Sequence, residues 1–153
     1  MQIRELDRSE VIAVGGGVLL ALSIFMGWYS LGNRYAYVNS CRGAHATCSG
    51  LTSLGPVAYV LLVMAVTPLV LAWVVVRGRV LPWPRGELTA VISLVALTLI
   101  LFRGLIDRPG WPSGEIGIGT GWFIALLGGL LILAGALTRV YESTARRKPP
   151  GMF

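Results

Sequence analysis

The sequence predicts an all-α membrane protein, an antiparallel bundle of four transmembrane helices with up-down-up-down topology. Of its 153 residues, 55% are hydrophobic and 13% are charged, whereas a soluble domain has about 25% charged residues. Charged residues are absent from four stretches, residues 11–33, 43–76, 88–102 and 116–138. About 20 apolar residues suffice for one helical span. This pattern excludes a disordered chain and a soluble enzyme, argues against nucleic-acid binding, and makes residues 1–153 a single membrane domain.

We expect the helices at residues 11–31, 57–76, 88–106 and 116–138. Helices fit better than barrel strands, because strands would alternate apolar and polar residues over about ten positions and no such alternation occurs. The outer loops would then be residues 32–56 and 107–115, and the cytoplasmic loop residues 77–87. Such short connections make neighbouring helices antiparallel. Residues 1–10 would be a cytoplasmic lead, and residues 139–153 a cytoplasmic basic tail.

The distribution of cationic residues predicts the orientation, because short cytoplasmic loops are rich in lysine and arginine. Nine of the thirteen cations would lie on the side of the termini: Arg4, Arg8, Arg77, Arg79, Arg85, Arg139, Arg146, Arg147 and Lys148. The other four are Arg34, Arg42, Arg103 and Arg108. Both termini are therefore expected in the cytoplasm. The predicted location is the inner (plasma) membrane of a bacterium, with the lipid bilayer as the first partner.

Small residues at regular spacing predict where the helices pack, since small side chains let backbones approach closely in lipid. One ridge on the first helix and one on the last repeat every four residues: Ala13, Gly17 and Ala21, then Gly117, Gly121, Ala125 and Gly129. A second ridge on the last helix repeats every seven residues: Gly121, Gly128 and Gly135. Two ridges cannot face one neighbour. The second could therefore pack within the chain or against another copy in a homo-oligomer.

Pro68 lies in the middle of the second predicted helix, where proline removes a backbone hydrogen bond and can kink the helix. The hydroxyl of Thr67 could satisfy part of the freed backbone. The kink could be purely structural, or it could widen a cavity for a lipid or another hydrophobic ligand.

Charged and aromatic residues mark the predicted outer boundary. Arg103 and Asp107 are four residues apart on one helix face, so they can form an interfacial ion pair. A functional charge within the membrane is the alternative. An aromatic belt at this boundary would consist of Trp28, Tyr29, Tyr59, Trp111 and Trp122.

The first outer loop contains Cys41, His45 and Cys48, a set with three interpretations. In an oxidising compartment the two cysteines most simply form a disulfide. As C-x3-H-x2-C, the set could instead hold a metal, although a fourth ligand is absent. As a redox pair, the cysteines would make the chain resemble the four-helix thiol oxidoreductases of the DsbB and vitamin K epoxide reductase type. That resemblance covers the architecture alone, because those families carry C-x-x-C pairs.

The order Trp28, Cys41, Cys48 also resembles the W…C…C pattern of claudin-like four-span proteins. The GLW element of that pattern is missing, and YAYVNSC stands in its place. The loop is about half as long as in that family, so we expect at most a short hairpin through residues 35–38. More generally, the chain resembles the small four-span membrane proteins of bacteria.

Several functions are excluded by what the sequence lacks. His45 is the only histidine and lies in a loop, which argues against haem ligation within the bundle. The predicted spans contain no Asp or Glu, although ion-coupled transport usually needs buried carboxylates. We find no catalytic motif, and therefore predict no enzyme, no metal site and no cofactor.

The expected function is that of a structural or accessory subunit or a homo-oligomer. One alternative is an oligomeric channel or small-solute pore, for which Thr89, Ser93 and Thr98 are the candidate polar stripe. The other is the binding of a lipid or hydrophobic ligand near Pro68.

Overall fold

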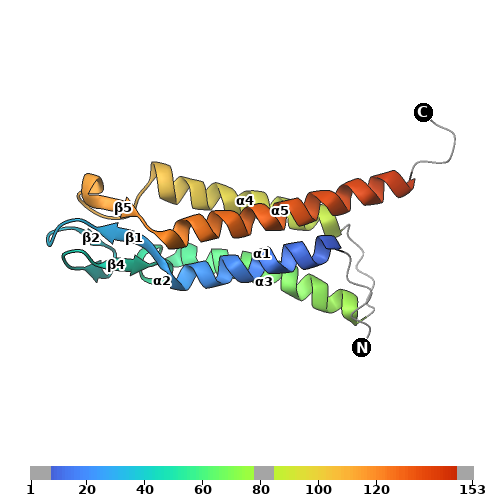
Figure 1. Ribbon diagram of the computed structural model, residues 1–153, viewed down its shortest axis with the longest axis horizontal. Coiled ribbons are helices and arrows are strands. Elements are labelled where there is room, and N and C mark those ends of the chain that lie inside the picture. Colours follow the sequence, from blue (N-terminus) through green and yellow to red (C-terminus); the bar gives the residue numbers. More distant parts are fainter. Residues whose placement is uncertain (1–7, 78–84, 148–153) are drawn as a thin grey trace.

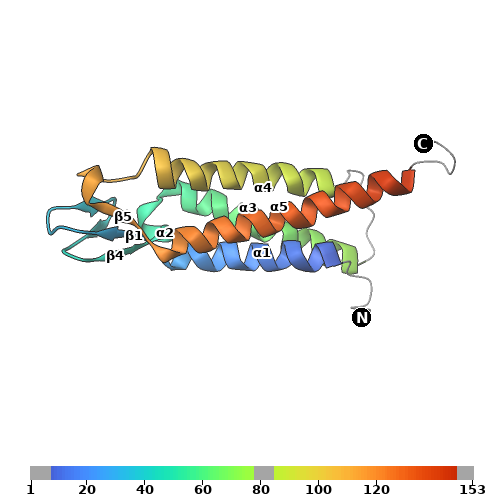
Figure 2. The same ribbon diagram turned by 45° about the horizontal axis from the view of Figure 1, so that its top comes forward.

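The computed structural model describes residues 8–77 and 85–147. Within them, four helices are long and apolar enough to cross a membrane. They are α1 (Arg8–Phe25), α3 (Pro56–Val76), α4 (Arg85–Leu101) and α5 (Thr120–Arg147), and a π-helical turn, Phe102–Ile106, continues α4. The helices lie side by side along the long axis, and the strands gather at one end (Figures 1 and 2). That end, residues 27–55 and 107–119, is called the head below.

The head contains two small antiparallel sheets. Strands β4 (Thr47–Ser49), β1 (Gly27–Leu31) and β5 (Ile116–Ile118) form the first, in that order. Strands β2 (Tyr37–Val38) and β3 (Cys41–Arg42) form the second, and a single bridge joins Tyr37 to Trp111. The short helix α2 (Gly50–Ser53) leads from β4 towards α3. The expectation of at most one short hairpin in this region is therefore wrong.

Two of the errors in the predicted helix ends concern strands of the head. The first helix ends at Phe25 rather than at residue 31, and the last begins at Thr120 rather than at residue 116. A strand that is buried on both faces has an unbroken apolar sequence, which cannot be told from the end of a helix by periodicity. In β1, the adjacent residues Trp28 and Tyr29 are both buried.

Among the remaining ends, the largest difference is nine residues, at the C-terminal end of the last helix. Helix α3 begins at Pro56 and ends at Val76, beside the predicted bounds of 57 and 76. Helix α4 begins three residues earlier than predicted. Helix α5 continues to Arg147, so much of the predicted tail is helical. Residues 1–7, 78–84 and 148–153 lie outside the described residues, and with them most of the predicted lead and cytoplasmic loop.

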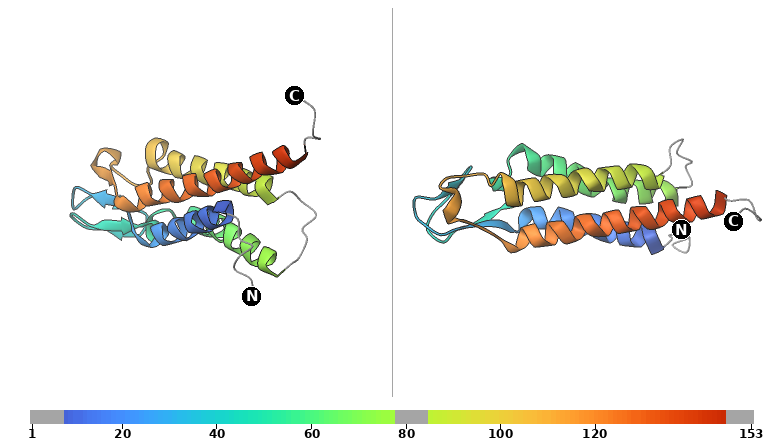
Figure 3. Two further views of the ribbon diagram at one scale, coloured as in Figure 1. Left: turned by 45° about the vertical axis from the view of Figure 1, so that its right-hand side comes forward. Right: turned by 90° about the horizontal axis from the view of Figure 1, so that it is seen from above.

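Helices α1 and α5 form the closest helix pair, and glycines make this approach possible (Figure 3). A Cβ atom on Gly128 would lie 2.7 Å from the Leu20 nitrogen, and one on Gly16 would lie 2.6 Å from the Gly128 carbonyl oxygen. Further along, a Cβ on Gly135 would lie 2.6 Å from the Ser9 carbonyl oxygen. The ridge of seven-residue spacing on α5 therefore packs against α1.

The two ridges of four-residue spacing, one on α1 and one on α5, also contact other helices of the same chain. A Cβ on Gly129 would meet Leu97 of α4 at 2.8 Å, and one on Gly17 would meet the Ala65 carbonyl of α3 at 2.5 Å. The other predicted packing residues on the helices are buried or half-buried: Ala13, Ala21, Gly121 and Ala125. The second neighbour of α5 is thus α4.

Gly117 is the exception among the predicted packing residues, because it lies in β5 and not on a helix. It stands opposite Ser30 of β1, and a Cβ on Gly117 would meet the Ser30 hydroxyl at 2.5 Å. Its prediction as a helix-packing residue is wrong. Strand β5 is apolar and lies directly before α5 in the sequence, so periodicity cannot distinguish the strand from the start of the helix.

Pro68 is buried within α3, which remains helical on both sides of it. Its ring faces α1, where a Cβ on Gly17 would meet the Pro68 Cγ at 2.9 Å. The Thr67 hydroxyl donates to the Val63 carbonyl at 2.8 Å. The carbonyl that proline leaves without its usual donor is that of Met64, so Thr67 does not satisfy it through this bond.

Candidate functional site

The disulfide joins the two sheets of the head. The Sγ atoms of Cys41 in β3 and Cys48 in β4 are 2.03 Å apart. The cysteine thiols are therefore not available as metal ligands, and no cluster of three or more His, Cys, Asp and Glu residues occurs within the described ranges. The bond closes a loop that contains Gly43 and His45, both at positive φ. The geometry thus fits the predicted disulfide between Cys41 and Cys48.

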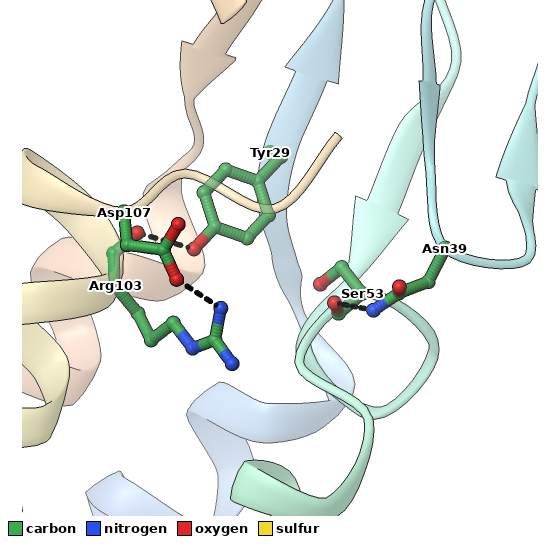
Figure 4. Close-up of polar contacts among 5 residues, drawn as sticks. All are labelled: Tyr29, Asn39, Ser53, Arg103 and Asp107. Carbon is green, nitrogen blue, oxygen red and sulfur yellow. Dashed lines mark hydrogen bonds and ion pairs between the residues drawn. The ribbon is translucent and has the colours of Figure 1, made fainter. Parts of the chain in front are cut away.

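Two aromatic side chains fix the head to the helices, and a third, Trp122, joins α5 to α4. The Tyr29 hydroxyl donates to the Arg103 carbonyl at 2.8 Å (Figure 4). The Trp122 indole donates to the Ile100 carbonyl at 2.9 Å, and the Trp28 indole to the Ser23 carbonyl at 2.7 Å. All three side chains are buried. Of the residues predicted for an aromatic belt, these three pack inward, where their polar ends meet helix carbonyls, whereas Tyr59 and Trp111 are exposed.

Burial dominates the ionisation of Tyr29. It raises the pKa of the Tyr29 hydroxyl to about 12, while the charges of Arg103 and Arg108 act in the opposite direction. The hydroxyl therefore stays protonated around neutral pH and remains a hydrogen-bond donor.

Arg103 and Asp107 lie at the end of the π-helical turn. Their Nη1 and Oδ2 atoms are 2.7 Å apart, with the Asp107 side chain 54% exposed (Figure 4). Exposed pairs of this kind contribute about 0–1 kcal/mol. The geometry agrees with an interfacial ion pair more than with a charge buried in the membrane.

Arg108, next along the chain, is held by two backbone carbonyls. Its Nε donates to Gly104 at 3.0 Å and its Nη1 to Ile116 at 3.1 Å. It lines a cavity of about 540 Å³ whose polar lining residues also include Ser30, His45 and Glu115. A second cavity of about 440 Å³ shares Arg108 and Gly114 with it. The first of these is called the head cavity below.

The head also exposes aromatic residues. Tyr35 is 74% exposed and Trp111 is 65% exposed. The backbone N–H and carbonyl of Tyr37 form hydrogen bonds with those of Trp111. The Arg42 guanidinium lies over the Tyr37 ring, 5.6 Å from its centre. Tyr35, Tyr37, Arg42 and Trp111 are called the aromatic patch below.

A buried ion pair at the opposite end of the molecule is missed by the sequence prediction. Glu10 of α1 and Arg139 of α5 approach to 2.7 Å, with the Glu10 side chain 8% exposed. The second carboxylate oxygen of Glu10 and the hydroxyl of Ser9 are buried without a hydrogen-bond partner. The candidate span of α1 starts at Arg8 and thus includes Glu10, one residue before the predicted start.

An apolar groove of about 560 Å³ follows α3 beside Pro68, lined by Leu62, Val63, Val66, Thr67, Val70 and Leu71. The C-terminal end of α3 points away from α4 in Figures 1 and 3. The candidate pore residues on α4 do not share one surface, because Thr89 and Ser93 are buried whereas Thr98 is exposed.

The chain matches no protein-family model, no curated protein and no solved structure. The resemblances to claudin-like and to bacterial four-span proteins stay predictions. The function is therefore inferred from the residues and their geometry.

Proposed function

We propose that the chain is a non-enzymatic, multi-pass membrane protein that acts as a structural or accessory subunit and binds its partner through the aromatic patch. Its four helices would cross the plasma membrane in alternating directions as an antiparallel bundle. Both termini would lie in the cytoplasm and the head outside.

The exposure of the aromatic patch carries this proposal. Tyrosine, tryptophan and arginine dominate the energetic centres of protein interfaces, and the head exposes all three types: Tyr37 contacts Arg42 and pairs with Trp111, and Tyr35 lies two residues from Tyr37 in the chain. The glycine ridges, by contrast, are occupied by contacts within the chain. This favours a second protein that binds at the head over a homo-oligomer built on those ridges.

Affinity purification from native membranes in mild detergent tests the proposal. We expect one protein to co-purify in a fixed ratio with the wild type, and to be lost with Trp111→Ser or Tyr35→Ser. The matched control is Tyr141→Ser, because Tyr141 is 78% exposed but lies on α5 outside the head. A particle that contains only this chain, whether a monomer or a homo-oligomer, would contradict an accessory role.

The groove along α3 supports a second candidate function, the binding of a lipid chain or another hydrophobic ligand. Its lining is aliphatic except for Thr67, and the Thr67 hydroxyl is already bonded to Val63, so an apolar chain is the complementary occupant. Val66→Trp should fill the groove and reduce lipid retention in native mass spectrometry. The control is Val91→Trp, an exposed position on α4. Equal retention by both variants would exclude a specific lipid site.

A further inference from the structure

The head cavity presents one acid and one base that do not pair with each other. Arg108 and Glu115 both line it, yet the ion pairs found in residues 8–77 and 85–147 are Arg103–Asp107 and Glu10–Arg139. A cavity with separate positive and negative groups is complementary to a ligand that carries both charges. We propose that the head cavity binds a small zwitterion, with an anionic group at Arg108 and a primary ammonium at Glu115. A dipeptide or a phosphatidylethanolamine headgroup has this chemistry.

The Arg108 side chain is held in position by the protein itself and keeps donors that can bind an anion. A guanidinium has five N–H donors, and Arg108 uses its Nε and one Nη1 donor on the carbonyls of Gly104 and Ile116. The remaining donors can bind a carboxylate or a phosphate. Since the side chain is already held at two points, it loses little conformational entropy when a ligand binds.

Glu115 lies next to Gly32. The Gly32 amide donates to the Glu115 carbonyl at 2.9 Å. A Cβ on Gly32 would lie 2.7 Å from the Glu115 Oε2 atom. The carboxylate thus lies beside Gly32, at the end of β1. An ionised carboxylate only accepts hydrogen bonds, and an ammonium group supplies three donors.

His45 gives the cavity a third polar group. Its backbone has φ of 55°, a conformation that few residues other than glycine adopt, and the Cys41–Cys48 disulfide closes the loop that holds it. Backbone strain of this kind concentrates at functional sites. The imidazole can donate to or accept from the backbone of a bound peptide.

The full chain in phosphatidylcholine nanodiscs provides the binding test, because this lipid has no primary ammonium. Titration calorimetry should detect binding of L-alanyl-L-alanine. The N-acetylated and the C-amidated dipeptides should each bind about tenfold more weakly or worse, since each lacks one charge-assisted contact.

A second arm distinguishes the two sources of the zwitterion. Nanodiscs that contain phosphatidylethanolamine should weaken dialanine binding if the lipid headgroup is the natural occupant, and should leave it unchanged if the natural occupant is a soluble zwitterion. Absence of dialanine binding in phosphatidylcholine, together with no preferential retention of phosphatidylethanolamine, would overturn the proposal.

Glu115→Gln keeps the shape of the side chain and removes its charge, so it should weaken dialanine binding about tenfold and leave the N-acetylated dipeptide unaffected. Glu142→Gln is the control, because Glu142 is an exposed glutamate on α5 outside the head. Wild-type affinity in Glu115→Gln, or an equal loss in Glu142→Gln, would contradict the assignment. Trp111→Ser should still bind dialanine, which separates this site from the proposed partner surface.

Discussion

At the scale of single residues, the pair formed by Glu10 and Arg139 joins the two ends of the chain. Glu10 lies in the first turn of α1 and Arg139 near the end of α5. Removing one member of a buried pair leaves the other charge without compensation, which costs several kcal/mol, whereas replacing both is much less harmful. The unsatisfied second oxygen of Glu10 makes this carboxylate especially dependent on Arg139.

We therefore expect Arg139→Gln to destabilise the protein by about 3 kcal/mol, near the lower end for buried pairs because the Arg139 side chain is 21% exposed. The double variant Glu10→Gln, Arg139→Gln should recover part of this loss. Thermal unfolding in detergent, followed by tryptophan fluorescence, gives the required double-mutant cycle. Additive effects of the two substitutions would show that the pair does not couple α1 to α5.

Tyr29 predicts a loss of stability in alkaline solution. Below pH 10 the hydroxyl is protonated in both the folded and the unfolded chain, so its pKa shift has no effect on stability. Between pH 10 and about 12 the unfolded chain releases this proton while folded Tyr29 retains it, and stability falls as the pH rises. Tyr29→Phe should be less stable at pH 8 by about 1 kcal/mol, the contribution of one hydrogen bond, and this difference should shrink towards pH 11. Thermal melts of both proteins across this range measure it, and a constant difference would refute the assignment.

At the scale of elements, the α1–α5 contact depends on glycines at defined positions. A methyl group on Gly128 would collide with the backbone of α1, at the Leu20 nitrogen and the Gly16 carbonyl. Gly128→Ala should therefore cost about 1–3 kcal/mol, as overpacking does. Gly15→Ala is the matched control, because a Cβ there meets nothing within 4 Å and alanine favours the helix by about 0.5–1 kcal/mol. Melting temperatures of the two variants should move in opposite directions, and a shared direction would argue against this packing.

The helices could be predicted from the sequence because each is a long apolar run, and both ion-pair partners Arg103 and Asp107 followed from helical spacing. Strand β1 could not be predicted, since Trp28, Tyr29 and Leu31 are all buried and prolong the apolar run of α1. Glu10 was missed because its partner lies 129 positions away in the sequence. The head cavity was missed for the same reason: Gly32, Arg108 and Glu115 meet only after β1 and β5 have paired.

At the scale of the whole molecule, the structure divides into a helical body and a polar head. The body is held by close backbone contacts between α1, α3, α4 and α5. The head is fixed to it by the hydrogen bonds of Tyr29 to the Arg103 carbonyl, in the π-helical turn after α4, and of Trp28 to the Ser23 carbonyl of α1. Since the disulfide also braces the head, the aromatic patch and the head cavity are presented as rigid surfaces at one end of the molecule.

The uneven distribution of cations predicts on which side of the membrane that head lies. Nine of the thirteen lysines and arginines belong to the segments that the sequence assigns to the side of the termini, and positively charged segments of this length are retained in the cytoplasm. A disulfide also persists best outside the cytoplasm.

We expect Asn33→Cys, in the head, to react with a membrane-impermeant maleimide on intact cells, and Thr144→Cys, on α5, to react only after permeabilisation. Both positions are exposed, and the wild type, whose two cysteines are bonded to each other, supplies the unlabelled control. Labelling of Thr144→Cys on intact cells would reverse the orientation, and it would move the zwitterion site and the partner surface into the cytoplasm.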